Sequence, residues 1–146
     1  RSNLANVEKF LSNKTFEAAD SWLQTDEGAV VGADGYGFSK QCMIVYMFQM
    51  AGELARKNIR INTICPSPTE SAFTEQMAEI GMGKDVTDLF TPPNGQYATG
   101  GDMGDALVAI NSNLFRFVSG CLIPVDWAYT AEITAGQRDN LLNISL

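Results

Sequence analysis

Tyr36 and Lys40 are the residues of this chain whose types and spacing point most directly to chemistry. They stand four residues apart in the segment YGFSK, at the start of a long helical pattern. Residues four apart lie on the same face of an α-helix, so the phenol and the ammonium can point into one cleft. A cation beside a phenol favours the phenolate, which suits the tyrosine to proton transfer. The pair predicts a centre that exchanges a proton with a carbonyl or alcohol oxygen.

The helix that positions this pair is predicted from about Tyr36 to Lys57. Its apolar residues recur with helical spacing, and they are Met43, Ile44, Met47, Phe48, Met50, Ala51 and Leu54. Arg56 and Lys57 stand at the negative C-terminal end. Ahead of it, Leu4–Leu23 has the pattern of one or two short amphipathic helices. Residues Gln24–Gly35 carry three glycines and several acids, which predicts a loop.

Strands and helices alternate beyond this helix. A strand is predicted over Ile59–Cys65 and a helix over Thr69–Met82. A loop over Asp85–Gly101 leads to a second helix over Asp102–Phe117 and a second strand over Cys121–Asp126. This alternation is typical of an α/β fold with a parallel sheet. Two strands leave such a sheet with open edges, so we expect the chain to be part of a larger sheet. From Ala131 onward the sequence has no strong pattern.

Length, composition and charge limit the functions that are possible. The 146 residues suit one domain, and 45% hydrophobic residues is ordinary for a globular core. The formal net charge is −7 and the ten lysines and arginines are scattered, which argues against a nucleic-acid partner. We see no apolar run of membrane-spanning length and no signal peptide, so no membrane partner is expected.

Cysteine and histidine content narrows the chemistry further. Cys42, Cys65 and Cys121 lie in apolar segments without a C-x-x-C pairing. An odd number of such thiols suits a reducing compartment, so we expect a cytoplasmic location. The chain has no histidine, which excludes Ser-His and Cys-His nucleophiles made by this chain alone and removes the commonest metal ligand. No metal is implied.

Four segments in a fixed order resemble the C-terminal half of a short-chain dehydrogenase/reductase. They are YGFSK around Tyr36, NIRINTI from Asn58, PSPTES from Pro66, and GCLIPVDWAYTA from Gly120. The resemblance implies the C-terminal part of a Rossmann-like, doubly wound parallel sheet that binds NAD or NADP. It implies that Tyr36 is the general acid/base and that Lys40 holds the nicotinamide ribose and tunes the tyrosine.

The same resemblance implies that the loop after the first strand lines the nicotinamide. Its residues are Pro66, Ser67, Thr69 and Ser71. Ser67 stands where the family has glycine, which reduces backbone freedom beside the cofactor. Thr69 and Ser71 precede a helix, so capping of that helix is an alternative role for their hydroxyls. The family's Gly-Gly after the last strand is replaced by Trp127-Ala128, which puts the usual contacts there in doubt.

Residues 31–146 correspond to the C-terminal half of the family domain, and residues 1–30 to a helical insertion ahead of the catalytic helix. We expect the family's catalytic serine and its glycine-rich dinucleotide fingerprint to lie upstream of Arg1, because neither is found here. A helical insertion at this point is similar to the bacterial 3α-hydroxysteroid dehydrogenase/carbonyl reductase subgroup.

The implied function is that of an NAD(P)-dependent oxidoreductase, active only together with the N-terminal half. It would act on a secondary alcohol or ketone, a small molecule that resembles a steroid. A homodimer or homotetramer is expected, with the helices at Tyr36–Lys57 and Asp102–Phe117 and the final strand as subunit contacts. The alternative is a non-catalytic Rossmann-like fragment or pseudoenzyme that serves as a binding or dimerisation module.

Overall fold

The computed structural model describes residues 3–79 and 88–140, and its fold is α/β. The chain divides into two compact units, which are described one at a time. The first unit comprises the chain up to Ile61 together with Ser119–Cys121. The second comprises Asn62–Val118 and the chain from Leu122 onward. Among the described residues, no helix is long and apolar enough to cross a lipid bilayer.

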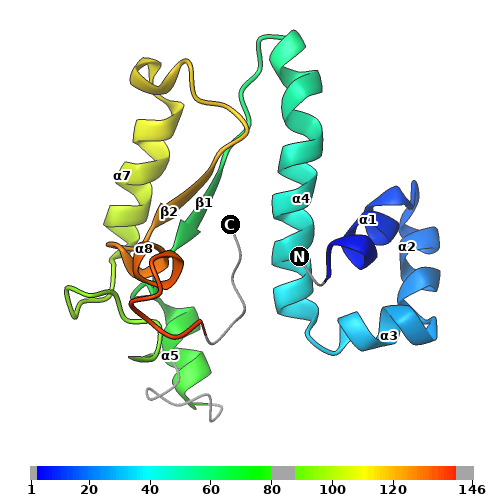
Figure 1. Cartoon of the computed structure of the whole chain (residues 1–146), viewed down its shortest axis with the longest axis horizontal. Coiled ribbons are helices and arrows are strands. Elements are labelled where there is room, and N and C mark those ends of the chain that lie inside the picture. Colours follow the sequence, from blue (N-terminus) through cyan, green and yellow to red (C-terminus); the bar gives the residue numbers. More distant parts are fainter. Residues whose placement is uncertain (1–2, 80–87, 141–146) are drawn as a thin grey trace. The chain divides into compact units, whose positions relative to one another are not determined.

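The first unit consists mainly of helices that gather against one long helix (Figure 1). They are α1 (Leu4–Ser12), α2 (Phe16–Leu23), α3 (Asp26–Gly32) and the long α4 (Gly35–Arg56). The buried core of the unit joins Val7 of α1 and Val31 of α3 to Phe38 and Cys42 of α4. The two short helices expected over Leu4–Leu23 are therefore confirmed as α1 and α2.

Helix α3 shows that the predicted loop over Gln24–Gly35 was wrong. The Thr25 hydroxyl caps this helix by accepting a hydrogen bond from the Gly28 amide at 3.1 Å. Asp26 and Glu27 lie in its first turn, where carboxylates complement the positive end of the helix dipole. The glycines and acids that indicated a loop are thus accommodated in a short capped helix.

Helix α4 confirms the long helix predicted at Tyr36–Lys57 and has defined ends. The Asp34 carboxylate caps its start by accepting the Gly37 amide at 3.0 Å. At its end Asn58 adopts a left-handed φ of 58°. The Asn58 amide then donates to the Ala55 carbonyl at 3.0 Å and the Ile59 amide to the Leu54 carbonyl at 3.0 Å. These two hydrogen bonds form a Schellman motif. Its left-handed residue is Asn58, and asparagine adopts this conformation more readily than most residues do.

The second unit contains the two strands, β1 (Thr63–Pro66) and β2 (Leu122–Val125). They pair in parallel, with Thr63 opposite Leu122 and Pro66 opposite Val125 (Figure 1). The predicted parallel pairing is confirmed, although β1 begins four residues later than the predicted strand.

The backbone just ahead of β1 forms irregular hydrogen bonds within the first unit. The Ile61 amide donates to the Ser119 hydroxyl at 3.2 Å, and the Ile61 carbonyl accepts the Gly120 amide at 2.7 Å. Gly120 has a φ of 73°, and a Cβ there would lie 3.0 Å from the Ala51 side chain. Glycine therefore fits this position for both conformational and steric reasons.

The helices of the second unit are α5 (Ala72–Glu79), α7 (Gly100–Asn111), the 3₁₀ turn η1 (Asn113–Phe115) and α8 (Tyr129–Thr134). The predicted Asp102–Phe117 helix is shifted, because Thr99 and Asp102 form a capping box that starts α7 at Gly100. Ser112 then leaves the helix with an extended ψ of 166°. The far end of the helix predicted over Thr69–Met82 falls outside the described residues.

A strained turn joins β2 to α8, just ahead of the tail in which no strong pattern was predicted. Trp127 has a φ of 45° and Ala128 a φ of 74°, both in the left-handed region. The Asp126 carboxylate accepts the Thr130 amide at 2.9 Å and so stabilises the first turn of α8. The backbone here has the conformation that glycines adopt easily, although neither residue is a glycine.

Candidate functional site

Helix α4 brings Tyr36 and Lys40 together, as their spacing predicts. The Lys40 Nζ lies over the Tyr36 ring, 5.2 Å from its centroid. Both side chains are exposed, and Tyr36 keeps 67% of its surface accessible. A cation at this distance from a phenol ring attracts it by about 0.5–1 kcal/mol at an exposed site. The two groups can therefore act on the same ligand.

The first turn of α4 holds the backbone of this pair in place. Besides the Asp34 cap, the Ser39 hydroxyl donates to the Tyr36 carbonyl at 2.7 Å. The Tyr36 hydroxyl itself makes no hydrogen bond to any other residue in the part of the chain that the structure describes. A phenol whose O–H is uncommitted can exchange its proton with a bound substrate.

The loop Pro66–Ser71 follows the carboxyl end of β1 in the second unit and is tied down by the backbone of other segments. The Ser67 amide donates to the Val125 carbonyl at 3.0 Å. The Ala98 amide donates to the Pro68 carbonyl at 3.0 Å, and the Glu70 amide to the Ala98 carbonyl at 2.8 Å. These bonds give the loop a fixed shape at the edge of the sheet where parallel α/β folds bind their ligands.

Some polar groups of the loop are already bonded and others are open. The Thr69 hydroxyl donates to the Ser67 carbonyl at 2.9 Å. The Ser71 hydroxyl accepts the Thr74 amide at 3.3 Å and so caps α5, which supports the capping alternative for Ser71. Within the described residues, the Thr69 amide has no hydrogen-bond partner. This amide is a donor that the loop can offer to a ligand.

Ser67 does not introduce strain where glycine was expected. Its φ is not among the positive values of this structure, so a residue with a side chain fits there without cost. Cys65 lies just before the loop and is half-buried. Burial raises the pKa of its thiol, and the Asp126 carboxylate raises it further. Cys65 is therefore held as a neutral thiol and suits a packing role.

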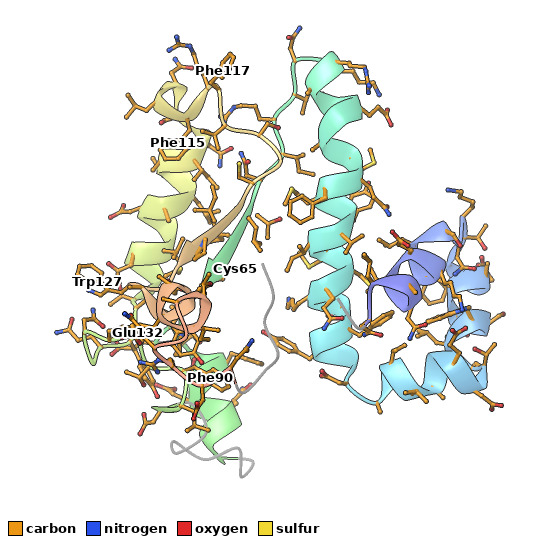
Figure 2. The ribbon with its side chains drawn as sticks, in the orientation of Figure 1. Cys65, Phe90, Phe115, Phe117, Trp127 and Glu132 are labelled. Atoms are coloured by element: carbon orange, nitrogen blue, oxygen red, sulfur yellow. The ribbon has the colours of Figure 1, made fainter. Side chains whose placement is uncertain are left out.

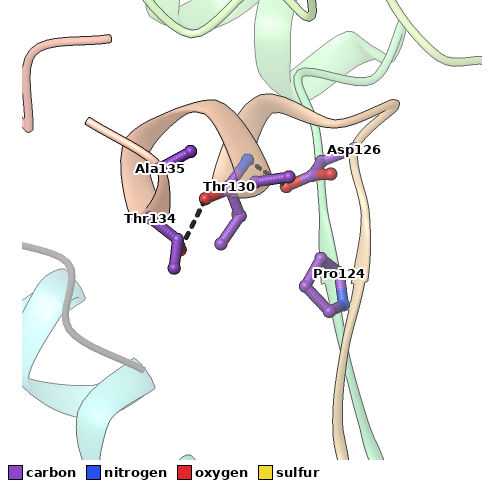
Figure 3. Close-up of a pocket in the computed structure, with 6 residues that line it drawn as sticks. Pro124, Asp126, Thr130, Thr134 and Ala135 are labelled. Carbon is purple, nitrogen blue, oxygen red and sulfur yellow. Dashed lines mark hydrogen bonds between the residues drawn. The ribbon is translucent and has the colours of Figure 1, made fainter. Parts of the chain in front are cut away.

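An open hollow of about 370 Å³ lies between β2 and α8, and sequence reasoning did not foresee it (Figure 3). Its walls are formed by Pro124, Asp126, Thr130, Ala131, Thr134 and Ala135. The Asp126 carboxylate and the Thr134 hydroxyl are already bonded to the Thr130 amide and carbonyl. The hollow is thus mostly apolar, with the Asp126 carboxylate and the Thr134 hydroxyl committed to α8.

The segment after α8 is fastened by Arg138, which the sequence also did not single out. Its guanidinium donates from Nε to Glu132 at 2.8 Å and from Nη1 to the Thr91 carbonyl at 3.2 Å. It also lies 4.7 Å from the centre of the Tyr129 ring. Burial raises the pKa of Tyr129, with Asp126 adding to the rise and Arg138 opposing it. Tyr129 is therefore a buried packing residue.

The predicted site residues thus form two groups, one in each unit. Tyr36 and Lys40 lie in the first unit, and the Pro66–Ser71 loop lies in the second. In the part of the chain that the structure describes, no group of three or more histidine, cysteine, aspartate or glutamate side chains is arranged to hold a metal ion. The groups that are present could transfer a proton at Tyr36 and donate hydrogen bonds at the loop.

Comparison with protein families decides what kind of protein carries these groups. A family model described as enoyl-(acyl carrier protein) reductase matches residues 23–130, which is well over half of the chain. The chain belongs to the short-chain dehydrogenase/reductase family. The matched range includes the Tyr36–Lys40 pair, the Pro66–Ser71 loop and β2 of this dehydrogenase/reductase chain.

A curated relative of this dehydrogenase/reductase chain comes from Xanthobacter autotrophicus strain Py2 and is named inactive 2-(S)-hydroxypropyl-CoM dehydrogenase 2. It is 29% identical over 116 residues, covering 71% of this chain and 49% of that protein. The chain therefore spans about half the length of this relative.

Two solved structures show the same fold. A short-chain dehydrogenase family protein from Francisella tularensis matches 67% of this chain and 44% of its own, at 24% identity and a TM-score of 0.57. The 3-alpha-hydroxysteroid dehydrogenase from Pseudomonas sp. B-0831, complexed with NADH, matches 88% of this chain and 49% of its own. Its identity is 18% and its TM-score 0.70.

Proposed function

We propose that this chain supplies the proton-transfer half of an NAD(P)-dependent dehydrogenase/reductase. The observation that carries the proposal is the Lys40 ammonium 5.2 Å from the centre of the Tyr36 ring on one face of α4. The substrate would be a secondary alcohol or a ketone. The whole activity would require the dinucleotide-binding half of the family domain as well.

Tyr36 would move the proton and Lys40 would stabilise the charge that this leaves. During ketone reduction the Tyr36 hydroxyl gives its proton to the substrate oxygen, and during alcohol oxidation the phenolate takes it back. The Lys40 ammonium lies 5.2 Å from the centre of the ring, where its positive charge would attract the negative charge that forms during the step. NAD or NADP, when bound, would supply the hydride chemistry at the substrate carbon, while Tyr36 handles the proton at the oxygen.

The Pro66–Ser71 loop would hold the nicotinamide end of NAD or NADP. The open Thr69 amide suits a carboxamide oxygen, and the bonds from Ser67 and Glu70 fix the loop around it. Pro66 and Ser67 would provide contact surface, and Ser71 would contribute through its backbone, because its hydroxyl is bonded to both the amide and the hydroxyl of Thr74. The solved 3-alpha-hydroxysteroid dehydrogenase, which shares the fold, is complexed with NADH.

A steroid-like or similarly apolar carbonyl compound is the substrate that we propose. The match to the 3-alpha-hydroxysteroid dehydrogenase covers 88% of this chain. Residues 23–146 make up less than that share of the chain, so the match must extend further towards the N-terminus. Some of the first 22 residues therefore have a counterpart in that fold. This supports residues 1–30 as the helical insertion of that subgroup, ahead of a family domain at residues 31–146.

Assembly into a homodimer or homotetramer is part of the proposal. Large apolar side chains are exposed on and after α7, among them Val108, Leu114 and Phe117. Figure 2 shows Phe115 and Phe117 near the C-terminal end of α7. Such side chains are typical of surfaces that meet another subunit. Light scattering of the full-length protein that gave a monomer mass at micromolar concentration would contradict it.

A second candidate function is that of a non-catalytic binding or dimerisation module. The observation that favours it is the name of the Xanthobacter relative, which describes that protein as inactive. In this case the full-length protein would bind a dinucleotide or a second subunit without turnover. Measured oxidation of any secondary alcohol by the wild-type protein would exclude it.

Replacing Lys40 tests the proposed pair. We expect Lys40→Met in the full-length protein to lower kcat at least tenfold and to weaken dinucleotide binding, because the ammonium is proposed to serve both the phenol and the ribose. Lys57→Met is the matched control, since Lys57 lies just beyond α4 and pairs with Glu53 at 2.6 Å. Equal turnover of the two variants would contradict the role of Lys40.

A further inference from the structure

A cluster of three aromatic rings lies on the face of α4 opposite Tyr36 and Lys40. Phe38 is two residues from each of them, and two residues turn an α-helix by about 200°. The Phe38 ring stacks on Trp22 of α2 at 6.2 Å and meets Phe10 of α1 edge-on at 5.4 Å. Phe10 and Trp22 also meet edge-on at 5.9 Å.

The same face of α4 continues this contact for another two turns. Phe38 and Cys42 are buried and Val45 is packed against them, at positions i, i+4 and i+7. We call these three residues the inner stripe of α4. Helices α1, α2 and α3 supply the other side of the core, and α1 and α3 contact α4 directly (Figure 1). The half of α4 that carries the inner stripe is the half that carries Tyr36 and Lys40.

The proton-transfer pair has little packing of its own to hold it. Tyr36 is 67% exposed and Lys40 is exposed. The direction in which their Cα–Cβ bonds point is fixed by the helix backbone. That backbone is held by the Asp34 cap at its start and by the inner stripe along its buried side. A small tilt or fraying of these turns would therefore displace both functional groups together.

We infer that α1, α2 and α3 are a positioning element for the proposed reaction, acting through the inner stripe of α4. This inference rests on the proposed function of Tyr36 and Lys40. Phe10, Trp22 and Phe38 are positioning residues, because their rings pack against one another on the opposite face of α4. Displacing a reacting group by about 1 Å can cost about a hundredfold in rate, so a loosened inner stripe lowers turnover without removing any reacting group.

The test replaces Trp22 in the full-length protein. Trp22→Leu keeps apolar bulk but removes the flat ring, and Trp22→Phe restores a ring. The matched control is Ile110→Val, because Ile110 is buried in α7 of the second unit. Three quantities are compared: hydrogen exchange of the backbone amides of residues 38–42, kcat, and the dissociation constant for NADH.

We expect Trp22→Leu to speed exchange at residues 38–42 at least tenfold and to lower kcat at least tenfold, with NADH binding changed less than twofold. Trp22→Phe should return both quantities to within about threefold of wild type, and Ile110→Val should change neither. Unchanged exchange at residues 38–42, or faster exchange with unchanged kcat, would overturn the inference. An equal loss of kcat in Ile110→Val would do so as well, because it would show a general effect of stability.

Two further variants keep the outcome decisive. If Trp22→Leu does not fold, Phe10→Leu makes the same comparison from α1, at the other edge of the ring cluster. If Tyr36→Phe is as active as wild type, the proposed function fails. The exchange measurement still reports whether the ring cluster holds residues 38–42, so the two failures can be told apart.

Discussion

At the residue scale, Trp127 and Ala128 have the least favourable backbone in the described chain. Both have a positive φ, of 45° and 74°, although each carries a Cβ. A left-handed conformation costs a residue with a side chain about 1–2 kcal/mol. The cost is balanced by what the turn achieves, because it brings the Thr130 amide to the Asp126 carboxylate and starts α8. The Trp127 side chain is left 73% exposed.

Ala128→Gly should stabilise the protein. Glycine removes the strain at φ 74° but adds flexibility to the unfolded chain, so we expect a net gain of about 0.5 kcal/mol in the free energy of unfolding. Ala131→Gly is the control, because Ala131 lies inside α8 and should lose about 0.5–1 kcal/mol. Urea unfolding of the full-length protein measures both. A lower stability for Ala128→Gly would show that the turn is not strained.

Cys42 gives the stability a dependence on pH. Burial in the core raises the pKa of its thiol above the ordinary value of 9.0, so the folded state favours the neutral form. In the unfolded chain the thiol ionises at its ordinary pKa. The stability contributed by the neutral thiol is therefore complete below about pH 9 and is lost as the pH rises through the folded-state pKa. Cys65, whose pKa is also raised, acts in the same direction.

Cys42→Ala should make the protein less sensitive to alkali. We expect the free energy of unfolding of the wild type to fall between pH 8 and pH 10, and that of Cys42→Ala to fall less steeply. Val45→Ala is the control, since it thins the same inner stripe but leaves the thiol in place. It should lower stability at every pH and keep the wild-type slope. Identical slopes for all three proteins would contradict a buried neutral thiol at this position.

At the scale of elements, the corner between α2 and α3 depends on Gly28. A Cβ at this position would run into the Trp22 carbonyl oxygen and would lie 2.7 Å from the Leu23 Cα. These are backbone atoms, which cannot move aside without shifting α2. Gly32, at the other end of α3, has open space around it. Position 28 therefore has no room for a side chain, whereas position 32 of the same short helix does.

Gly28→Ala should lower the free energy of unfolding by about 1–3 kcal/mol, the usual cost of overpacking a close contact. Gly32→Ala should instead stabilise it by about 0.5–1 kcal/mol, because alanine is the better helix former. Thermal unfolding of the full-length protein, followed by circular dichroism, compares the two. A tolerated Gly28→Ala would mean that α2 and α3 do not approach each other as closely as described here.

The elements that the sequence predicts well are those held by local forces. The apolar spacing of α4 and the four-residue spacing of Tyr36 and Lys40 each depend on one helix, so both could be predicted. Helix α3 could not, because its glycines indicate a loop and only the close approach to Trp22 explains Gly28. The shape of the Pro66–Ser71 loop could not be predicted either, because its backbone bonds to Ala98 and Val125, which are remote in sequence.

At the scale of the whole molecule, the family assignment relates the features of the two units to one proposed reaction. The first unit provides a tyrosine with a lysine ammonium beside it, and the second provides a fixed loop at the carboxyl end of a parallel strand. The chain spans about half of its curated relative. The proposed reaction therefore also requires a dinucleotide-binding half, because proton transfer has to be joined to hydride transfer.

The most direct test of the central claim is the turnover of Tyr36→Phe in the full-length protein. Tyr46→Phe is the control, since Tyr46 is an exposed tyrosine on the same helix. Removing the phenol of a general acid/base should lower kcat for alcohol oxidation by about 10²–10⁴-fold. The dissociation constant for the dinucleotide should stay within about threefold of wild type, and Tyr46→Phe should match wild type in both. Turnover by Tyr36→Phe equal to that of Tyr46→Phe would contradict the assignment of Tyr36 as the proton-transfer residue.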